Sequence, residues 1–175
     1  TLVSRARNLP HTDELFAAIS PLGTVSLYLN TNSQNTNVIF GEDFRLLQGQ
    51  DVLEDTLCGL TFKLSPAAFF QVNPRQTEAL YGEALRFAGL RPEDTLMDVY
   101  CGAGTISLFL ARRAREVIGV EIVEAAVADA RKNAERNRIV NTRFFAGKAE
   151  SIVPRLYSEG IRHADVIVVD PPRKG

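Results

Sequence analysis

The sequence contains few of the residues that bind metals or form disulfides. It has two cysteines and two histidines among 175 residues. Cys58 and Cys101 are 43 positions apart, and neither has a second thiol or a histidine near it. Structural zinc sites and redox pairs need such residues at close spacing. The sequence therefore argues against both kinds of site, predicts no metal, and indicates a reduced, cytoplasmic protein.

Long apolar runs and a strong charge of one sign are also absent. No apolar stretch approaches the roughly 20 residues that span a bilayer, and the N-terminus lacks the pattern of a signal peptide. We therefore expect no membrane partner. The formal net charge of -1 gives no sign of a nucleic-acid-binding protein. However, residues 1–60 carry three Lys or Arg against seven Asp or Glu, whereas residues 61–175 carry 17 against 14, so the second part is mildly basic.

The length and the apolar pattern predict two parts. A chain of 175 residues is long enough for one domain and part of a second. Short apolar stretches at 25–29 and 37–40 alternate with turn-forming residues, which is typical of strands, and residues 11–19 have helical spacing. We interpret residues 1–60 as a small α+β subdomain. Because the chain begins with Thr1 rather than Met, we expect a piece of a longer protein.

Residues 61–175 change to an alternating pattern. After a strand at 59–64 and a helix at 74–88, apolar strands alternate with helices, which is typical of a parallel sheet covered on both faces. As in doubly wound folds, we expect the last strand to lie beside the first, with its far edge exposed and prone to association. The predicted strands are 96–100, 116–121, 142–146 and 165–170, and the predicted helices are 105–113, 123–137 and 149–159.

A glycine-rich turn joins the first strand of this sheet to its helix. Gly102 and Gly104 let the backbone approach a ligand closely, beside the free N–H groups of a helix N-terminus. A dinucleotide fingerprint needs a third glycine, but Ser107 stands at that position, which weakens the case for NAD. Asp98 before the turn and Glu121 at the end of the next strand are instead typical of S-adenosylmethionine enzymes. The carboxylate of Glu121 could accept hydrogen bonds from both ribose hydroxyls.

A proline-rich turn follows the last predicted strand at the same edge of the sheet. Asp170 precedes Pro171 and Pro172, whose fixed φ angles predict a rigid loop that can hold a carboxylate and a target base in fixed relation. Enzymes that methylate exocyclic amines have an aromatic residue after a similar Asp-Pro-Pro, whereas this chain has Arg173. Amine methylation is therefore disfavoured.

Five short motifs follow one another along this sequence, and their order is the basis of a family resemblance. They are Ser65-Pro-Ala-Ala-Phe-Phe-Gln-Val-Asn73, Asp98-Val-Tyr-Cys-Gly-Ala-Gly-Thr-Ile-Ser-Leu108, Gly119-Val-Glu121, Asp129-Ala-Arg-Lys-Asn133 and Val169-Asp-Pro-Pro-Arg-Lys-Gly175. In this order they resemble the RNA uracil-5-methyltransferase family, most of all the bacterial enzymes that act on 23S ribosomal RNA. The resemblance implies an α/β fold: a truncated Rossmann-like class I S-adenosylmethionine-dependent methyltransferase domain at 61–175, preceded by the α+β subdomain.

The resemblance also implies the cofactor and its contacts. S-adenosylmethionine is the expected cofactor and 23S ribosomal RNA the expected partner, while the oligomeric state is left open. The family's four cofactor contacts carry over to Gln71, Tyr100, Glu121 and Asp170, in addition to the glycines of the turn. Gln71 would reach the methionine end of the cofactor, and Tyr100 stands where many relatives have phenylalanine.

The reaction implied by the resemblance needs residues beyond these contacts. A cysteine thiolate adds to carbon 6 of uracil, carbon 5 then attacks the methyl group, and a glutamate removes the proton from carbon 5. In the family both residues follow the Asp-Pro-Pro-Arg loop, which would place them after Gly175. We therefore expect no catalytic residue in this chain, and no activity from this chain alone. Cys101, in the glycine turn, and Cys58 are interpreted as structural.

Other interpretations of the same residues stay open. One is a class I methyltransferase that acts on another substrate, and the other is a module that binds the cofactor or RNA without catalysis. Gln71 could instead cap a loop, and Tyr100 could be an ordinary core residue. A basic run also stands between positions 131 and 143, but interleaved acidic residues favour a solvated helix face, so no RNA contact is assigned there. Its members are Arg131, Lys132, Arg136, Arg138 and Arg143.

Overall fold

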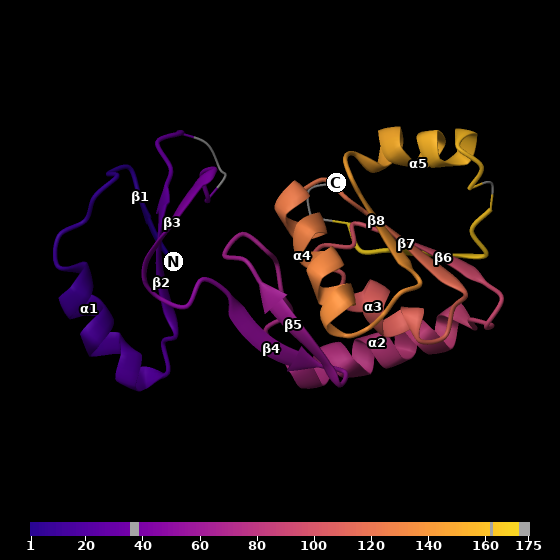
Figure 1. Ribbon diagram of the computed structural model, residues 1–175, viewed down its shortest axis with the longest axis horizontal. Coiled ribbons are helices and arrows are strands. Elements are labelled where there is room, and N and C mark those ends of the chain that lie inside the picture. Colours follow the sequence, from indigo (N-terminus) through magenta and orange to yellow (C-terminus); the bar gives the residue numbers. More distant parts are fainter. Residues whose placement is uncertain (36–38, 162, 172–175) are drawn as a thin grey trace. The chain divides into compact units, whose positions relative to one another are not determined.

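The computed structural model describes residues 1–35, 39–161 and 163–171, and its chain divides into two compact units (Figure 1). The first unit comprises residues 1–53 with 65–67, and the second comprises residues 54–64 with 68–175. The boundary predicted from the sequence lies after residue 60. Residues 54–60 instead group with the second unit, because they belong to a hairpin whose second strand is hydrogen-bonded to a helix of that unit.

The first unit is a three-stranded sheet with one helix. Its strands β1 (Leu2–Ser4), β2 (Ser26–Thr31) and β3 (Asp43–Gly49) lie in the order β1-β2-β3, and α1 (Thr12–Ile19) continues into a 3-10 turn, η1 (Ser20–Leu22). β2 is parallel to β1 and antiparallel to β3. The helix and β2 were predicted, whereas β1 and β3 were not. Within the predicted strand 37–40, residues 37 and 38 lie outside the described residues, and 39 and 40 are not in a strand.

A two-stranded hairpin, β4 (Leu53–Leu57) and β5 (Leu60–Leu64), precedes the larger sheet. Its tight turn contains Cys58 and Gly59, which have φ angles of 53° and 69°. Two consecutive positive φ angles are the geometry that matches the twist of paired strands. β5 alternates between buried and half-buried residues, and Leu60, Phe62 and Leu64 form its buried face. The hairpin therefore presents one apolar face to the second unit.

The larger sheet contains four parallel strands in the order β8-β7-β6-β9. They are β6 (Thr95–Val99), β7 (Glu116–Glu121), β8 (Thr142–Ala146) and β9 (Val166–Val169). The intervening helices are α3 (Thr105–Ala111), α4 (Glu124–Arg136) and α5 (Ala149–Ser158), and α2 (Pro74–Ala88) precedes β6. All of these elements were predicted to within two residues at each end. The predicted position of the last strand beside the first is confirmed.

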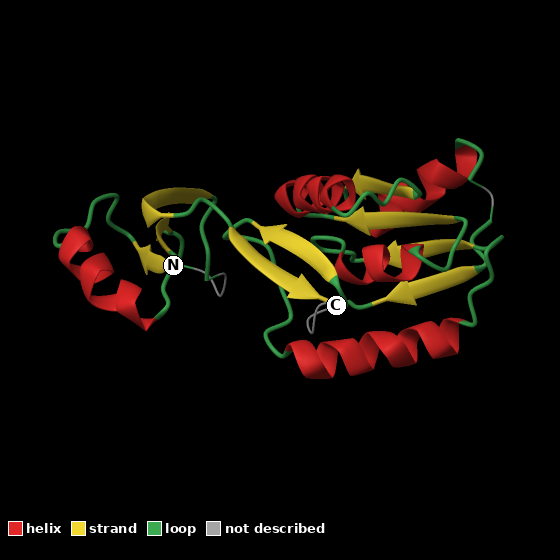
Figure 2. Cartoon of the chain, turned by 60° about the horizontal axis from the view of Figure 1, so that its bottom comes forward, coloured by secondary structure: helices red, strands yellow, loops and turns green. Residues whose placement is uncertain are grey.

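Helices cover the two faces of this sheet unequally (Figure 1 and Figure 2). Ile152 and Leu156 of α5 pack on one face, against Met97 of β6 and Ile118 and Val120 of β7. The opposite face is covered by α2, α3 and α4. On α4 the buried positions include three alanines four residues apart, Ala126, Ala130 and Ala134. Such small side chains at i, i+4 spacing allow the helix axis to approach the sheet closely.

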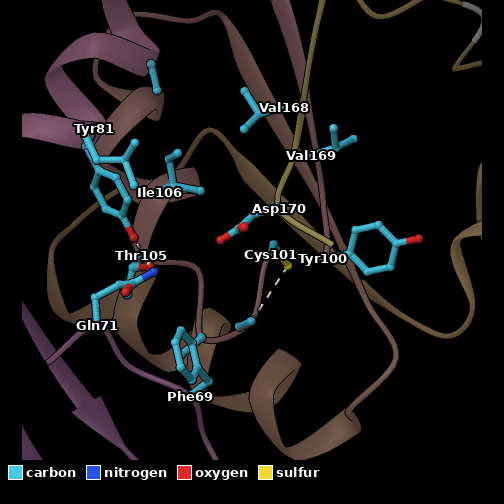
Figure 3. A pocket seen from close by; sticks show the side chains of 14 residues that line it. Phe69, Gln71, Tyr81, Tyr100, Cys101, Thr105, Ile106, Val168, Val169 and Asp170 are labelled. Atoms are coloured by element: carbon cyan, nitrogen blue, oxygen red, sulfur yellow. Dashed lines mark hydrogen bonds between the residues drawn. The ribbon is translucent and has the colours of Figure 1, made fainter. Parts of the chain in front are cut away.

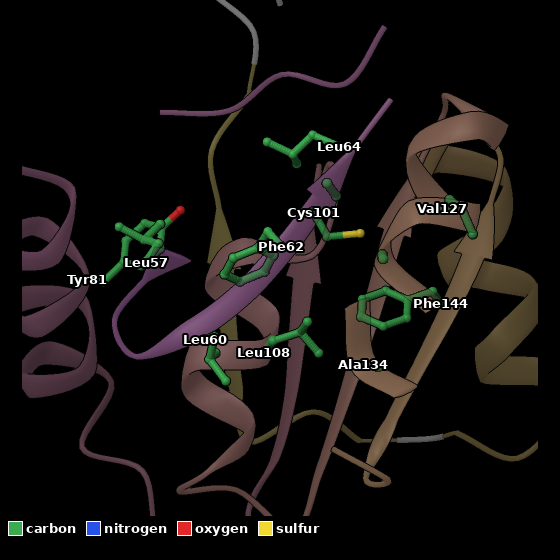
Figure 4. Close-up of a cluster of buried hydrophobic side chains, with 12 residues drawn as sticks. Leu57, Leu60, Phe62, Leu64, Tyr81, Cys101, Leu108, Val127, Ala134 and Phe144 are labelled. Carbon is green, nitrogen blue, oxygen red and sulfur yellow. The ribbon is translucent and has the colours of Figure 1, made fainter. Parts of the chain in front are cut away.

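The hairpin completes the core on the side of α4. Phe62 and Leu64 of β5 belong to one buried cluster with Cys101, Leu108 and Val127, as Figure 4 shows. This cluster therefore joins the hairpin, the turn after β6, α3 and α4. The turn after β6 is therefore packed against the hairpin, α3 and α4.

β9 has an exposed apolar surface. Ile167 and Val169 each keep 60% of their surface exposed, and β9 is paired with β6 on one side only within the described residues. In residues 1–35, 39–161 and 163–171, no helix is long and apolar enough to cross a membrane, and no group of three or more acidic, cysteine or histidine side chains is placed to hold a metal ion.

Candidate functional site

A cavity of about 220 Å³ lies where β6 and β9 end, within the second unit (Figure 3). Carboxyl ends of parallel strands at a change of strand order are where doubly wound sheets bind ligands. One wall comes from α2 and the segment before it, and the other walls come from the turn after β6 and the end of β9. The lining residues are Phe69, Gln71, Leu80, Tyr81, Ala84, Tyr100, Cys101, Gly102, Ala103, Thr105, Ile106, Val168, Val169 and Asp170.

The turn after β6 has an unusual backbone. Tyr100, Gly102 and Gly104 have φ angles of 73°, 54° and 81°, so three of five consecutive residues are left-handed. For tyrosine this conformation is strained, and such strain concentrates at functional sites. The N–H groups of Tyr100 and Cys101 both donate to Val120 O, at 2.8 and 3.1 Å. These bonds to β7 thus hold the start of the turn in this conformation.

The two glycines of the turn serve different purposes. A Cβ atom at Gly102 would meet nothing within 4 Å, so this position faces the open cavity. A Cβ atom at Gly104 would lie 3.0 Å from the Cβ atom of Ala130 on α4. Gly102 therefore leaves room for a ligand, whereas Gly104 lets α4 pack against the turn.

Glu121 is tied to the turn by its own carboxylate. Its Oε2 accepts a hydrogen bond of 3.1 Å from Gly102 N, and its Oε1 accepts one of 2.9 Å from Val123 N. These two N–H groups fix the plane of the carboxylate, and each oxygen keeps a further lone pair for a ligand hydroxyl. Glu121 does not itself line the cavity, but it is hydrogen-bonded to Gly102, which does.

Asp98 is a wholly buried carboxyl group beneath the turn. Its Oδ2 accepts a hydrogen bond from Ser107 Oγ, and its Oδ1 has no partner in the part of the chain that the structure describes. Burial raises the pKa of Asp98 to about 7, the bond from Ser107 opposes this rise, and the nearby carboxylates of Asp170 and Glu121 add to it. An unpartnered carboxyl oxygen at this depth is a costly feature, which is common at functional sites.

Tyr81 and Thr105 form a polar contact that was not predicted from the sequence. The Tyr81 hydroxyl lies 2.7 Å from Thr105 Oγ1, beside Gln71 on one wall of the cavity (Figure 3). Burial raises the pKa of Tyr81 to about 12, so its hydroxyl keeps its proton at neutral pH. A single tyrosine on a helix carries no sequence signal for a contact with a residue 24 positions away.

The structure brings together four of the six predicted cofactor-binding residues. Gln71, Tyr100, Gly102 and Asp170 line one cavity, although they are separated by up to 99 positions in the sequence. The other two, Glu121 and Gly104, support the turn as described above. Asp170 and Pro171 are described, but the predicted loop continues through Pro172 and Arg173, which lie outside the described residues.

Neither cysteine has the environment of an activated nucleophile. Cys101 lines the cavity but is only 4% exposed, and burial raises its pKa above the ordinary thiol value. The pKa of Cys58 is also raised, chiefly by burial, and its side chain packs against the core. Reactive cysteines instead have lowered pKa values and electropositive surroundings.

Comparison with known proteins supports the fold. Residues 90–171 match a family model described as a methyltransferase domain. An uncharacterized RNA methyltransferase of Listeria innocua is 50% identical over 99% of this chain, and one of Clostridium tetani is 47% identical over the same share. The chain spans 38% of the length of each of these relatives.

A solved structure is similar over nearly the whole chain. It is the tRNA (uracil-54, C5)-methyltransferase of Pyrococcus abyssi in complex with S-adenosyl-L-homocysteine, with a TM-score of 0.73, 27% identity, and coverage of 99% of this chain and 40% of that one. Together with the parallel sheet and the matched methyltransferase domain, this similarity shows the α/β, Rossmann-like fold of a class I methyltransferase that was predicted.

Proposed function

We propose that this chain forms the cofactor-binding part of an enzyme that methylates carbon 5 of uridine in 23S ribosomal RNA, with the cytoplasm as its compartment. The cofactor is S-adenosylmethionine, in agreement with the matched methyltransferase domain and with the S-adenosyl-L-homocysteine bound by the P. abyssi enzyme. The observation that carries the proposal is the convergence of Gln71, Tyr100, Gly102 and Asp170 on one cavity beside a glycine turn.

The chemistry of the cavity fits this cofactor. S-adenosylmethionine supplies an activated methyl group and carries positive charge on its sulfonium and amino groups. Asp170 lines the cavity and Glu121 borders it, whereas none of the lining residues in the described part of the chain is a lysine or arginine. Carboxylates around a largely apolar cavity favour a cationic ligand over an anionic one.

Each residue has a proposed role that its position supports. Glu121, oriented by two backbone N–H groups, would accept hydrogen bonds from the ribose hydroxyls. The side-chain amide of Gln71 would bind the methionine end of the cofactor, and Tyr100, directly after β6, would contact it. Asp170 begins the proline turn at the end of β9, so it would connect the cofactor with the target base.

Support for an RNA substrate comes from the names of the relatives. Two relatives of 50% and 47% identity are named as RNA methyltransferases, and the P. abyssi structure is named as a tRNA uracil-5 enzyme. The choice of 23S ribosomal RNA rests on the family resemblance of the sequence motifs. Transfer RNA is the second candidate substrate, because the P. abyssi enzyme has that substrate in its name.

Calorimetric titration with S-adenosylhomocysteine tests the cofactor site. We expect the wild-type chain to bind, and Glu121→Gln to lose binding, because an amide cannot accept from both N–H groups and the ribose at once. Glu116→Gln is the matched control, since Glu116 stands at the other end of the same strand and pairs with Arg143 at 2.6 Å. Equal binding by both variants would contradict the assignment of Glu121.

The RNA substrate is tested with the full-length protein. It would be incubated with radioactive S-adenosylmethionine and either unmodified 23S ribosomal RNA or unmodified transfer RNA, and the labelled nucleoside would be identified by mass spectrometry. The proposal expects 5-methyluridine in 23S ribosomal RNA. Label in transfer RNA alone would favour the second candidate, and label on another base would reject uracil-5 chemistry.

A further inference from the structure

Two asparagines of the α4 region pair with the edge of β5 as a neighbouring strand would. Asn133 Oδ1 accepts from Lys63 N at 2.8 Å, and its Nδ2 donates to Lys63 O at 3.2 Å. Asn137, which caps α4, repeats the pattern on Thr61, with bonds of 3.0 and 2.8 Å. Each amide side chain thus satisfies both backbone groups of one β5 residue, and both asparagines fasten the hairpin to α4.

Only one of the two asparagines is also hydrogen-bonded to a residue that lines the cavity. Asn133 is wholly buried, and its Nδ2 makes a second, longer bond of 3.4 Å to the carbonyl oxygen of Ala103. Ala103 is 2% exposed and lines the cavity within the turn after β6. The second bond of Asn137 Nδ2 goes instead to Asn133 O, within its own helix, at 2.8 Å. The two side chains therefore share one function and differ in one contact.

The contact with Ala103 holds the turn from the side of α4. Val120 O binds the start of the turn, and Glu121 binds Gly102 N, so both of these bonds come from β7. Gly104 N donates to Cys101 O inside the turn itself. A buried carbonyl such as that of Ala103 is costly to leave without a partner. Asn133 supplies that partner from α4.

We infer that Asn133 is a positioning residue for the proposed cofactor site. It links the edge of β5, the body of α4 and the turn after β6, and so keeps Ala103 and Gly102 at the distance from α4 that the cavity needs. This inference rests on the proposed function, because the turn matters only if it binds the cofactor. Asn137 fastens the same hairpin without this role.

The test compares Asn133→Asp with the matched control Asn137→Asp. In both variants the carboxylate keeps an acceptor for the β5 N–H group but has no donor for the carbonyl groups. Thermal unfolding would report the shared structural role, and we expect both melting temperatures to fall. Titration with S-adenosylhomocysteine would report positioning, and we expect affinity to fall about tenfold in Asn133→Asp, as for the loss of one hydrogen bond, and to stay within about twofold in Asn137→Asp.

Amide hydrogen exchange supplies a readout that does not depend on the cofactor. Without ligand, Gly102 and Gly104 N–H groups should exchange faster in Asn133→Asp than in the wild type, and at the wild-type rate in Asn137→Asp. If Asn133→Asp does not fold, Asn133→Ser and Asn137→Ser replace the pair, because a serine hydroxyl cannot reach Lys63 and Ala103 together.

The outcomes separate the two proposals. Equal loss of affinity and equal exchange in both variants would overturn the positioning role, as would unchanged affinity in a folded Asn133→Asp. If the wild-type chain does not bind S-adenosylhomocysteine, the proposed function fails for this chain. In that case faster exchange confined to the Asn133 variant would still support positioning of the turn, and its absence would reject it.

Discussion

Replacing Asp98 by asparagine tests whether the buried carboxyl group beneath the glycine turn is protonated in the folded protein. Burial raises its pKa from 3.8 to about 7, against the opposing bond from Ser107. The nearby carboxylates of Asp170 and Glu121 raise its pKa further. An asparagine has the same shape, can accept the same bond from Ser107, and cannot ionise.

The sign and size of the effect follow from the two pKa values. The folded state binds the proton more tightly than the unfolded state, so this stabilisation is full below about pH 4 and is lost as the pH rises to about 7. A difference of about three pH units corresponds to about 4 kcal/mol, and about 3 kcal/mol of this should be lost between pH 5 and pH 8. The Asp98→Asn variant loses none of it, because its amide does not titrate.

The assay is urea unfolding of both proteins at pH 5 and pH 8, followed by circular dichroism. The free energy of unfolding of Asp98→Asn, relative to wild type, should rise by about 3 kcal/mol between these pH values. Asp165→Asn is the control, because the backbone N–H of Thr95 lowers the pKa of Asp165, so its stabilisation is present above about pH 4 and lost as the pH falls. If the free energy of unfolding of the wild type changed between pH 5 and pH 8 by the same amount as that of Asp98→Asn, the reasoning would be refuted.

Two further substitutions test the packing around the cavity. In Gly119→Ala the new Cβ would lie 2.8 Å from Cys101 Sγ, so the free energy of unfolding in urea should fall by about 1–3 kcal/mol. In the control Gly82→Ala, on α2, the new Cβ meets no atom within 4 Å, so this variant should be as stable as the wild type or more stable. Equal effects of the two substitutions would contradict the packing argument. Tyr81→Phe removes the bond to Thr105 Oγ1, and the free energy of unfolding should fall by about 1 kcal/mol; no change would show that the bond makes no net contribution.

The parallel sheet was predictable because its sequence signals are local. β6, β7 and β9 are short apolar runs between helices, and a turn with Gly102 and Gly104 marks where the first of them ends. Such patterns fix both the type of element and the edge of the sheet at which its residues meet. The four site residues that line the cavity were found for the same reason, since each is at or near the end of a strand or belongs to a quoted motif.

The smaller strands were missed because tertiary contacts create them. β4 reads Leu-Glu-Asp-Thr-Leu, and four of its five residues are exposed, so it lacks the alternation that indicates a half-buried strand. β1 has three residues and exists through pairing with β2, more than 20 positions away. The boundary between the units differs from the predicted one for a related reason. The hydrogen bonds of Asn133 and Asn137 that attach β5 to α4 join residues 70 and 76 positions apart, so no local pattern indicates them.

The same distinction explains which parts of the site are visible in the sequence. Residues expected to touch the cofactor directly stand in compact motifs, because a strand end, a turn and a carboxylate must follow one another closely in the chain. The residues that hold these motifs in place, such as Tyr81 and Asn133, act through side-chain hydrogen bonds to partners 24 to 70 positions away. A cavity lined by Asp170 and bordered by Glu121 suits a cationic ligand, but the positions of these carboxylates depend on that less visible framework. Substitutions in the framework should therefore change affinity while every motif residue stays intact.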